Sequence, residues 1–278
     1  MGQQFGGNWT DHKMRIVVDY AKAYLVIMSK QAWIKTIYFD GFAGSGTITG
    51  EDGEEAKKGT ALRIMDIIEP KPFDMYYFVE MNEDYKGALE KEIMNNYPGQ
   101  KAFVVKDDCN NKLVSMAEFM KKNKAYRALA FVDPYGMDVR WSSIEALKGL
   151  GVDLWILVPT GVGANRLLKV NGEISEGWYQ ALENFLGLPR TEIEKRFYRR
   201  TTVNTLFGDH TRVTKEKASV QKLGELYAER LGEIFKHISQ PFIMKNSMNS
   251  IMYHFMMATN NDAGVKIAND VIKPRYAE

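Results

Sequence analysis

The feature that most constrains this chain is a short strand that breaks into glycines. Thr36 to Phe39 is a β-branched and aromatic run, and Asp40 follows it directly. The next residues run Gly41-Phe42-Ala43-Gly44-Ser45-Gly46. A glycine loop at the end of a strand lets the backbone approach a bound nucleotide where a Cβ would clash. The sequence therefore predicts either a nucleotide-binding loop here or, more simply, a glycine-rich turn after a buried strand.

Three loop types can be compared with this spacing. Gly41 and Gly46 have the spacing of a P-loop, but Thr47 stands where the phosphate-binding lysine belongs. The glycines are in the wrong order for a nicotinamide fingerprint. An acid followed by D-x-x-x-G-x-G resembles the pattern of class I S-adenosylmethionine (SAM) methyltransferases. On that resemblance the residues expected to bind SAM in this loop are Asp40, Gly41, Phe42, Ala43, Gly44 and Gly46.

Two later strands end on acidic residues. Met75 to Val79 is followed by Glu80, which is expected to accept the ribose hydroxyls of the cofactor or, alternatively, to begin the next helix. Ala102 to Val105 leads to Asp108 and Cys109. The Asp108 carboxylate suits the adenine amino group, and it equally suits a capped turn. Cys109 has no His or Lys beside it to lower the thiol pKa, so we expect a structural or cofactor-adjacent residue.

The fourth strand, Ala128 to Val132, runs into Asp133-Pro134-Tyr135-Gly136. As local chemistry this is a type I turn. The motif lies at the carboxyl end of a central strand, and open α/β sheets bind their ligands at that edge. The motif resembles the Asp-Pro-Pro-Tyr of amino-directed DNA and RNA methyltransferases, and more closely the Asp-Pro-Phe-Gly of tRNA guanine-N2 dimethyltransferases.

That motif suits methylation of a base amine. An exocyclic amine is conjugated with its ring, so its lone pair is a poor nucleophile. Acceptors from the Asp133 carboxylate and the Pro134 carbonyl can hold the two N–H groups and favour a pyramidal nitrogen. Tyr135 can stack on the flipped base, a contact worth roughly 1–3 kcal/mol. We therefore expect Asp133, Pro134 and Tyr135 to be the catalytic residues.

Strands alternating with helices predict a Rossmann-like class I α/β sheet of seven strands, the last pair an antiparallel hairpin. An N-terminal helical segment (1–35), with a helix from Asp11 to Ser29 capped by Thr10, precedes the SAM-binding core (36–162). A helical insertion (163–240) and a C-terminal hairpin and helix (241–278) complete the chain.

The insertion is expected to hold two helices, Trp178 to Leu206 and Val213 to Ile238, and it gathers basic residues around Phe197-Tyr198. A phosphate backbone is one partner for such a patch, and a solvated helix face is the alternative. The net charge of +2 means that any polyanion-binding surface must be local. The residues expected to contact a nucleic-acid substrate are Arg196, Arg199, Arg200, Lys215 and Lys217.

Composition indicates the cellular compartment in which the protein works. A single cysteine excludes an internal disulfide and suits a reducing environment. No apolar run reaches membrane-spanning length and the first residues lack an apolar signal core, so we expect a cytoplasmic protein without a membrane partner. The four histidines show no metal-ligand spacing, so no metal is expected, and His254 in an apolar strand is expected to be packed in the core.

Several stretches together resemble the three-Cys-motif partner proteins of bacteria and phages over nearly the whole chain. They are Trp9-Thr10-Asp11-His12-Lys13, Tyr38 to Gly44, Phe131 to Met137, Val158-Pro159-Thr160-Gly161 and Tyr253-His254. Ser45 departs from the proline expected in the family loop. The resemblance implies the class I fold and a possible three-Cys-motif protein partner.

These observations predict a SAM-dependent methyltransferase that acts on guanine N2 or adenine N6 of DNA or RNA. One rival is a non-catalytic subunit that binds SAM or nucleic acid and works with a three-Cys-motif partner. The other is a methyltransferase for a small molecule or a protein.

Overall fold

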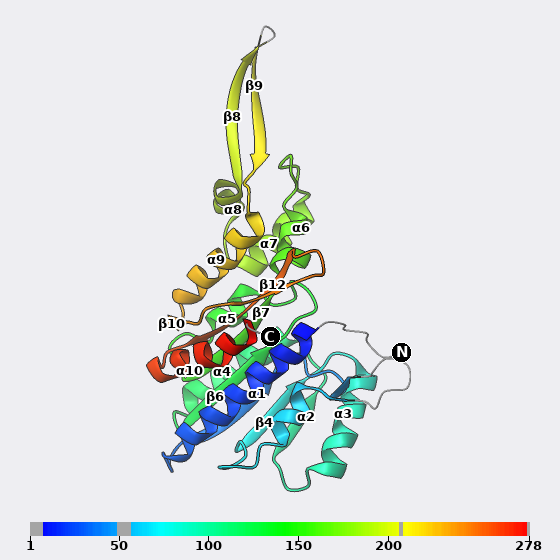
Figure 1. Cartoon of the computed structure of the whole chain (residues 1–278), viewed down its shortest axis with the longest axis vertical. Helices are drawn as coiled ribbons and strands as arrows, with labels where there is room; N and C mark the ends of the chain where they lie inside the picture. The colour runs from blue at the N-terminus through cyan, green and yellow to red at the C-terminus, as the bar shows by residue number, and fades with distance from the viewer. Residues whose placement is uncertain (1–7, 49–56, 206–207, 277–278) are drawn as a thin grey trace.

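The computed structural model describes residues 8–48, 57–205 and 208–276, and its centre is one eight-stranded sheet (Figure 1). Its strands are β1 (Lys35–Asp40), β4 (Met75–Val79), β5 (Ala102–Val105), β6 (Tyr126–Val132), β7 (Val152–Val158), β10 (His237–Ile238), β11 (Phe242–Lys245) and β12 (Ile251–Thr259). The order across the sheet is β10-β12-β7-β6-β1-β4-β5, and β11 also pairs with β12.

The directions of the strands identify the fold class. The five neighbouring strands β5, β4, β1, β6 and β7 are parallel, and β12 runs antiparallel to β7. The chain visits β1, β4 and β5 on one side and then returns to β6 and β7 on the other. The predicted Rossmann-like class I fold is confirmed, including the β11–β12 hairpin. One detail differs: β11 pairs antiparallel with β12, so only β12 is reversed relative to the parallel strands.

Helices cover both faces of the sheet, as the alternation of side chains along β1 requires. Ile37 and Phe39 point to one hydrophobic cluster, and Tyr38 belongs to the other. The helices on the Tyr38 side are α1 (Asn8–Ser29), α2 (Thr60–Met65), α3 (Glu83–Asn96) and α10 (Asp262–Ile272). Those on the other side are α4 (Cys109–Lys122), α5 (Trp141–Glu145), α7 (Glu176–Leu186), α8 (Arg190–Phe197) and α9 (Ser219–Gly232).

The first helix begins earlier than its cap signal indicates. α1 starts at Asn8, so Thr10 lies in the first turn and is not the N-cap. One side of α1 is apolar, and Ile16, Val17, Tyr20 and Tyr24 are buried on it. α1 lies beside the last helix, α10, in Figure 1. This packing carries the start of α1 to the carboxyl ends of the strands.

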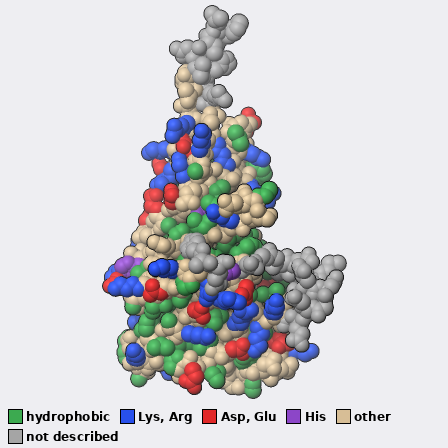
Figure 2. Space-filling model, viewed as in Figure 1, with side chains coloured by type: hydrophobic (Ala, Val, Ile, Leu, Met, Phe, Trp, Pro, Cys, Tyr) green, Lys and Arg blue, Asp and Glu red, His purple; other side chains and the backbone are tan. Residues whose placement is uncertain are grey.

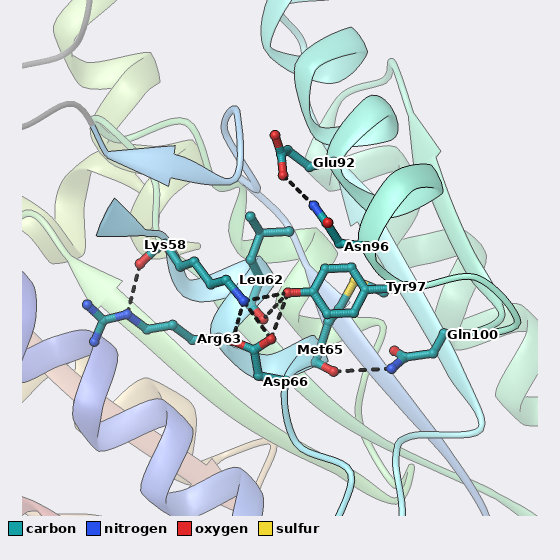
Figure 3. A network of polar contacts seen from close by, with 9 residues as sticks. All are labelled: Lys58, Leu62, Arg63, Met65, Asp66, Glu92, Asn96, Tyr97 and Gln100. Carbon is teal, nitrogen blue, oxygen red and sulfur yellow. Dashed lines mark hydrogen bonds and ion pairs between the residues drawn. The ribbon is translucent and has the colours of Figure 1, made fainter. Parts of the chain in front are cut away.

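The segment after the glycine loop is fastened by polar contacts (Figure 3). The predicted charged loop from Glu51 to Lys58 lies mostly outside the described residues, but β3 (Lys57–Lys58) pairs with β2 (Thr47–Ile48). The Lys58 Nζ donates to Asp66 Oδ1 at 2.7 Å and to the Tyr97 hydroxyl at 3.1 Å. The Tyr97 hydroxyl donates to Asp66 Oδ1 at 2.8 Å. These bonds connect α2 to α3 and hold the chain that leaves the glycine loop.

The predicted helical insertion is wrong in its central part. The expected helix from Trp178 to Leu206 is instead broken at Gly187 into α7 and α8. After α8 ends at Phe197, β8 (Tyr198–Thr205) follows and pairs with β9 (Gly208–Lys215). Threonine and valine recur through both strands, and β-branched residues favour extended backbone. The second expected helix likewise begins only at Ser219. Figure 1 shows the β8–β9 ribbon projecting from the body of the molecule.

Directly after β7 the chain makes two short helical turns, η1 (Thr160–Ala164) and α6 (Asn165–Leu167). The chain ends in α10 and a 3₁₀ turn, η2 (Lys273–Tyr276). None of the described helices is long and apolar enough to cross a membrane.

Candidate active site

A cavity of about 280 Å³ opens at the carboxyl ends of β1 and β6. These strands are neighbours in the sheet, and the chain order reverses between them, which is where open α/β sheets bind ligands. Its wall includes the glycine loop, the loop after β6, the first turns of α1 and Tyr253 of β12. The cavity therefore joins two motifs that lie far apart in the sequence.

The glycine loop has a backbone that needs its glycines. Gly44 and Gly46 have φ angles of +63° and +79°, in the left-handed region that side-chain-bearing residues rarely adopt. A Cβ on Gly41 would lie 2.4 Å from the Cys109 Sγ. The amide of Gly59 donates to the Gly46 carbonyl at 2.7 Å and closes the far end of the loop.

Asp40 is a buried acid at the floor of the cavity. Its Oδ1 accepts the Phe42 amide at 3.1 Å, and its Oδ2 accepts the Tyr38 hydroxyl at 3.3 Å. Burial raises the pKa of Asp40 to about 7, the bond from Phe42 opposes that rise, and the nearby Asp133 carboxylate adds to it. The side chain thus titrates near neutral pH.

Glu80 also supports the loop. Its Oε2 accepts the Gly44 amide at 2.9 Å, and its Oε1 accepts the Asn82 amide at 2.7 Å. It does not cap α3, since that role belongs to Asn82, which accepts from Asp84 and Tyr85. A carboxylate has about four lone-pair positions, so Glu80 retains capacity for two further donors.

Asp108 and Cys109 lie at the start of α4, behind the glycine loop. Asp108 is the N-cap, and its Oδ1 accepts from the amide and the side chain of Asn110 at 2.7 and 2.8 Å. Its Oδ2 lies 3.8 Å from Arg140. Cys109 is a free, buried thiol packed against Gly41, and burial raises its pKa well above the ordinary value. It is therefore a packing residue of the loop and no thiolate.

The acid of the Asp-Pro-Tyr motif has a partner that the sequence did not reveal. The ammonium of Lys13, on α1, donates to the Asp133 Oδ2. The Lys13 side chain is only 7% exposed and that of Asp133 is 23% exposed, so the pair is shielded from water on the lysine side. Both residues line the cavity.

Aromatic side chains surround this ion pair. The Phe42 and Tyr135 rings meet edge to face, with centroids 6.5 Å apart. On α1, the Trp9 ring lies 5.7 Å from the Tyr253 ring and 5.9 Å from the Lys13 Nζ. All four rings line the cavity, and Tyr135 is half exposed. The site therefore combines flat apolar faces with two carboxylates, those of Asp40 and Asp133, and one ammonium, that of Lys13.

Sequence reasoning did not select Lys13, Trp9 or Tyr253 as site residues. A signal for Lys13 exists: it lies on the helix face that also carries Ile16, Val17 and Tyr20, all of which are buried. A lysine in an apolar helical stripe must find a charged partner, because burying an unpaired ammonium is costly.

The basic residues of the insertion are not in the cavity. Arg196 pairs with Glu229 at 3.0 Å, Arg200 with Glu194 at 2.6 Å, and Arg199 with Glu216. The Lys215 Nζ donates to the carbonyls of Asn165 and Leu168 at 3.0 and 2.7 Å, and Lys217 is exposed. Figure 2 shows blue and red side chains intermixed below the ribbon tip.

His254 is packed in the core, as predicted. It is buried in β12, and its Nδ1 lies 2.8 Å from the Thr160 hydroxyl. Burial lowers the pKa of His254 to about 4, so the ring is neutral at ordinary pH. Its role is to join β12 to η1, next to the cavity.

No family model matches the chain, and no curated protein matches it by sequence. Among solved structures, it is similar to protein LPL1258 from Legionella pneumophila, of the DUF519 family model, with a TM-score of 0.51 and 12% identity over 96% of this chain and 92% of that one. That likeness shows the fold.

Two further solved structures are similar to this chain. Trm1 from Pyrococcus horikoshii, in complex with SAM, has a TM-score of 0.45 and 11% identity over 96% of this chain and 58% of that chain. An rRNA methylase from Streptococcus thermophilus has a TM-score of 0.34 and 10% identity over 82% of this chain and 88% of that one.

Proposed function

We propose that this protein is a SAM-dependent methyltransferase that acts on an exocyclic amine of a nucleic-acid base, guanine N2 or adenine N6. The observation that carries the proposal is the single cavity that joins the glycine loop to Asp133-Pro134-Tyr135. The first supplies a cradle for a cofactor, and the second supplies acceptors and a ring for a base.

The residues present fit SAM. A Cβ on Gly44 would meet nothing within 4 Å, so the loop leaves room there for a ligand, and Glu80 has lone pairs left for ribose hydroxyls. Asp108, the N-cap of α4 after β5, would face the adenine ring. SAM supplies the methyl group when bound. Its sulfonium and amino groups are cations, and the acids Asp40, Glu80 and Asp133 are close enough to influence one another electrostatically.

On the acceptor side, Asp133 would hold the amine. A carboxylate can accept from Lys13 and from a base N–H together. The Pro134 carbonyl would take the second N–H, and Tyr135 would stack on the base. Asp133 would then receive the proton that the amine loses on methylation. In this arrangement Lys13 is a positioning residue, since it holds Asp133 through an ion pair.

The resemblance to three-Cys-motif partner proteins adds a possible partner to the proposal. A subunit that binds SAM or nucleic acid without catalysis would use the same cavity. The pairing of Arg196, Arg199 and Arg200 with glutamates favours the other rival, a small-molecule or protein substrate, because it lowers the free positive charge of the insertion. A cytoplasmic location suits the free thiol of Cys109.

The test is incubation of the purified protein with labelled SAM and total DNA, tRNA or rRNA, followed by nucleoside mass spectrometry. We expect N2-methylguanine or N6-methyladenine. Label in a protein or a small molecule, with none in nucleic acid, would contradict the proposal. SAM binding with no methylated product would favour the subunit.

Gly44→Val tests whether SAM binds to the glycine loop, and calorimetry with SAM measures the binding. At a φ of +63° a β-branched residue is strained by roughly 1–2 kcal/mol, so the loop should change shape and SAM binding should be lost. Gly87→Ala on α3, where a Cβ meets nothing within 4 Å, is the matched control and should bind SAM normally. Binding by Gly44→Val equal to wild type would exclude this cradle.

A further inference from the structure

The β8–β9 ribbon is an isolated two-stranded sheet that projects from the body (Figure 1). Each strand has eight residues, which at about 3.4 Å per residue gives a length of roughly 27 Å. An isolated hairpin is marginally stable in water, because it buries little surface. A ribbon of this length therefore adds little to the stability of the fold, which indicates a role in binding a partner.

The base of the ribbon is hydrogen-bonded to the segment that follows η1, close to the loop after β6. The Lys215 Nζ donates to the carbonyls of Asn165 and Leu168, and the Tyr198 hydroxyl donates to the Lys169 carbonyl at 2.7 Å. These acceptors follow η1 at the carboxyl end of β7. A Cβ on Gly163 of η1 would lie 3.0 Å from Met137, in the loop that also carries Asp133 and Tyr135.

The exposed side chains at the lower part of the ribbon are cationic or hydroxylic. Arg199 and Arg200 have side chains that are 78% and 64% exposed, and they point to opposite faces because they are adjacent in a strand. Thr201, Thr202 and Thr214 are also exposed. The centre of a protein–protein interface is depleted in charge and enriched in aromatic residues, so this surface suits a polyanion better than a protein.

The arginines can leave their glutamates at small cost. Glu216, the partner of Arg199, is also paired with Lys222 at 2.8 Å. Glu194, the partner of Arg200, also accepts from Arg190 at 3.0 Å and from the Tyr179 hydroxyl at 2.9 Å. Each acid therefore keeps a partner if its arginine turns to a phosphate, and exposed ion pairs are weak.

We propose that the β8–β9 ribbon grips double-stranded DNA beside the target base by lying in its major groove. The B-form major groove, about 12 Å wide, admits a two-stranded ribbon, whereas the A-form major groove of RNA is too deep and narrow. A length of roughly 27 Å spans about eight base pairs at about 3.4 Å each. Arginines on both faces can reach phosphates on either side of the groove.

This inference rests on the proposed function in taking a nucleic acid as the substrate, and it names the duplex. A base inside a duplex must be flipped out for chemistry on its amine. A ribbon that holds the flanking duplex would fix the position of the flipped base relative to the cavity. A single strand needs no such grip.

The test measures binding of a 30-base-pair DNA duplex, the RNA duplex of the same sequence and the single DNA strand by fluorescence anisotropy, from 50 to 200 mM salt. We expect the wild type to bind the DNA duplex most tightly. R199A/R200A should weaken that binding and flatten the log–log salt slope by about 2, at about 0.9 per phosphate contact. The matched control K121A/K122A removes two charges from the exposed end of α4 and should leave the slope unchanged.

A second variant replaces residues 202–211 by Asn-Gly, which keeps the anchored base and closes it with a two-residue turn. It should lose duplex preference while binding SAM and methylating a short single-stranded oligonucleotide as wild type does. Equal binding of DNA and RNA duplexes, or full duplex binding by this variant, would overturn the inference. A change in sedimentation with unchanged DNA binding would identify a protein interface instead and overturn it as well.

These outcomes separate the two proposals. If no nucleic acid is methylated but duplex binding still depends on the ribbon, the proposed function fails and the ribbon inference stands. If methylation occurs and the ribbon variants bind duplex DNA normally, the ribbon inference fails alone.

Discussion

The glycine loop and the β8–β9 ribbon are held in opposite ways. The loop is fixed by buried contacts: Glu80 accepts the Gly44 amide, and Cys109 packs against Gly41. On the ribbon, Arg199 and Arg200 are largely exposed and share their acids with other donors. The loop is thus preformed for a small ligand, and the ribbon is adaptable. The difference indicates that the fold uses the glycine loop to bind a small ligand and a separate element, the ribbon, to bind a large partner.

The largest effect on activity should come from a substitution in the preformed cavity, at Asp133. Asp133→Asn removes the negative charge but keeps the size, so it should reduce methyl transfer by roughly 10²–10⁴-fold, the range for loss of a general base. SAM affinity should remain close to wild type. Nucleoside mass spectrometry with calorimetry measures both quantities. Asp107→Asn, an acid outside the cavity, is the control, and equal loss in the two variants would contradict the assigned role.

The next effect concerns pH and Asp40. Because the pKa is raised to about 7 in the folded protein, the folded state binds a proton more tightly than the unfolded chain between about pH 4 and 7. Stability contributed by this group is therefore present below pH 4 and is lost as pH rises to about 7. A shift from 3.8 to about 7 corresponds to about 4 kcal/mol.

Asp40→Asn tests this directly. Denaturant unfolding at several pH values should show that the wild type loses stability relative to the variant from pH 4 to 7, with no further change above. SAM, a cation, should favour the ionised acid, so wild-type affinity should rise through pH 7 while the variant stays flat. Parallel pH profiles for the two proteins would show that Asp40 does not titrate in this range.

A smaller effect is expected at Tyr135. Its ring packs edge-on against Phe42 and is half exposed, so Tyr135→Ala should leave the fold intact. Loss of a stacked base costs roughly 1–3 kcal/mol, which is about 5- to 150-fold in the Kd or KM for the nucleic acid. Tyr135→Phe keeps the ring and should retain most of the affinity. If Tyr135→Phe is as weak as Tyr135→Ala, the hydroxyl and not stacking is responsible.

The smallest effect is expected for DNA binding at Arg196, next to the adaptable ribbon. Arg196 belongs to α8, below the ribbon, and makes two bonds to Glu229 at 3.0 and 3.1 Å. Arg196→Ala should change duplex DNA binding by less than about twofold, because it lies outside the ribbon and exposed pairs are worth about 0–1 kcal/mol. Fluorescence anisotropy at 100 mM salt measures this. A loss as large as that of R199A/R200A would extend the binding surface onto α8.

The sequence alone determined the sheet and the glycine loop. The predicted strands 75–79 and 102–105 coincide with β4 and β5, because both are short continuous apolar runs. The need for glycine at Gly44 and Gly46 is a property of the local backbone. Asp133 at the end of β6 followed from counting strands. Signals of this kind reside within a few neighbouring residues.

Tertiary structure decided the rest. Lys13 and Asp133 are 120 residues apart, and only the packing of α1 against α2 and α10 brings them together. The pairing of Arg199 with Glu216 depends on the β8–β9 register, whereas the sequence analysis expected the two residues in different helices. The expected helices overlap most of β8 and the end of β9, although the threonines and valines of the ribbon favour strands. Ion pairs and strand pairing are long-range contacts, so local composition does not specify them.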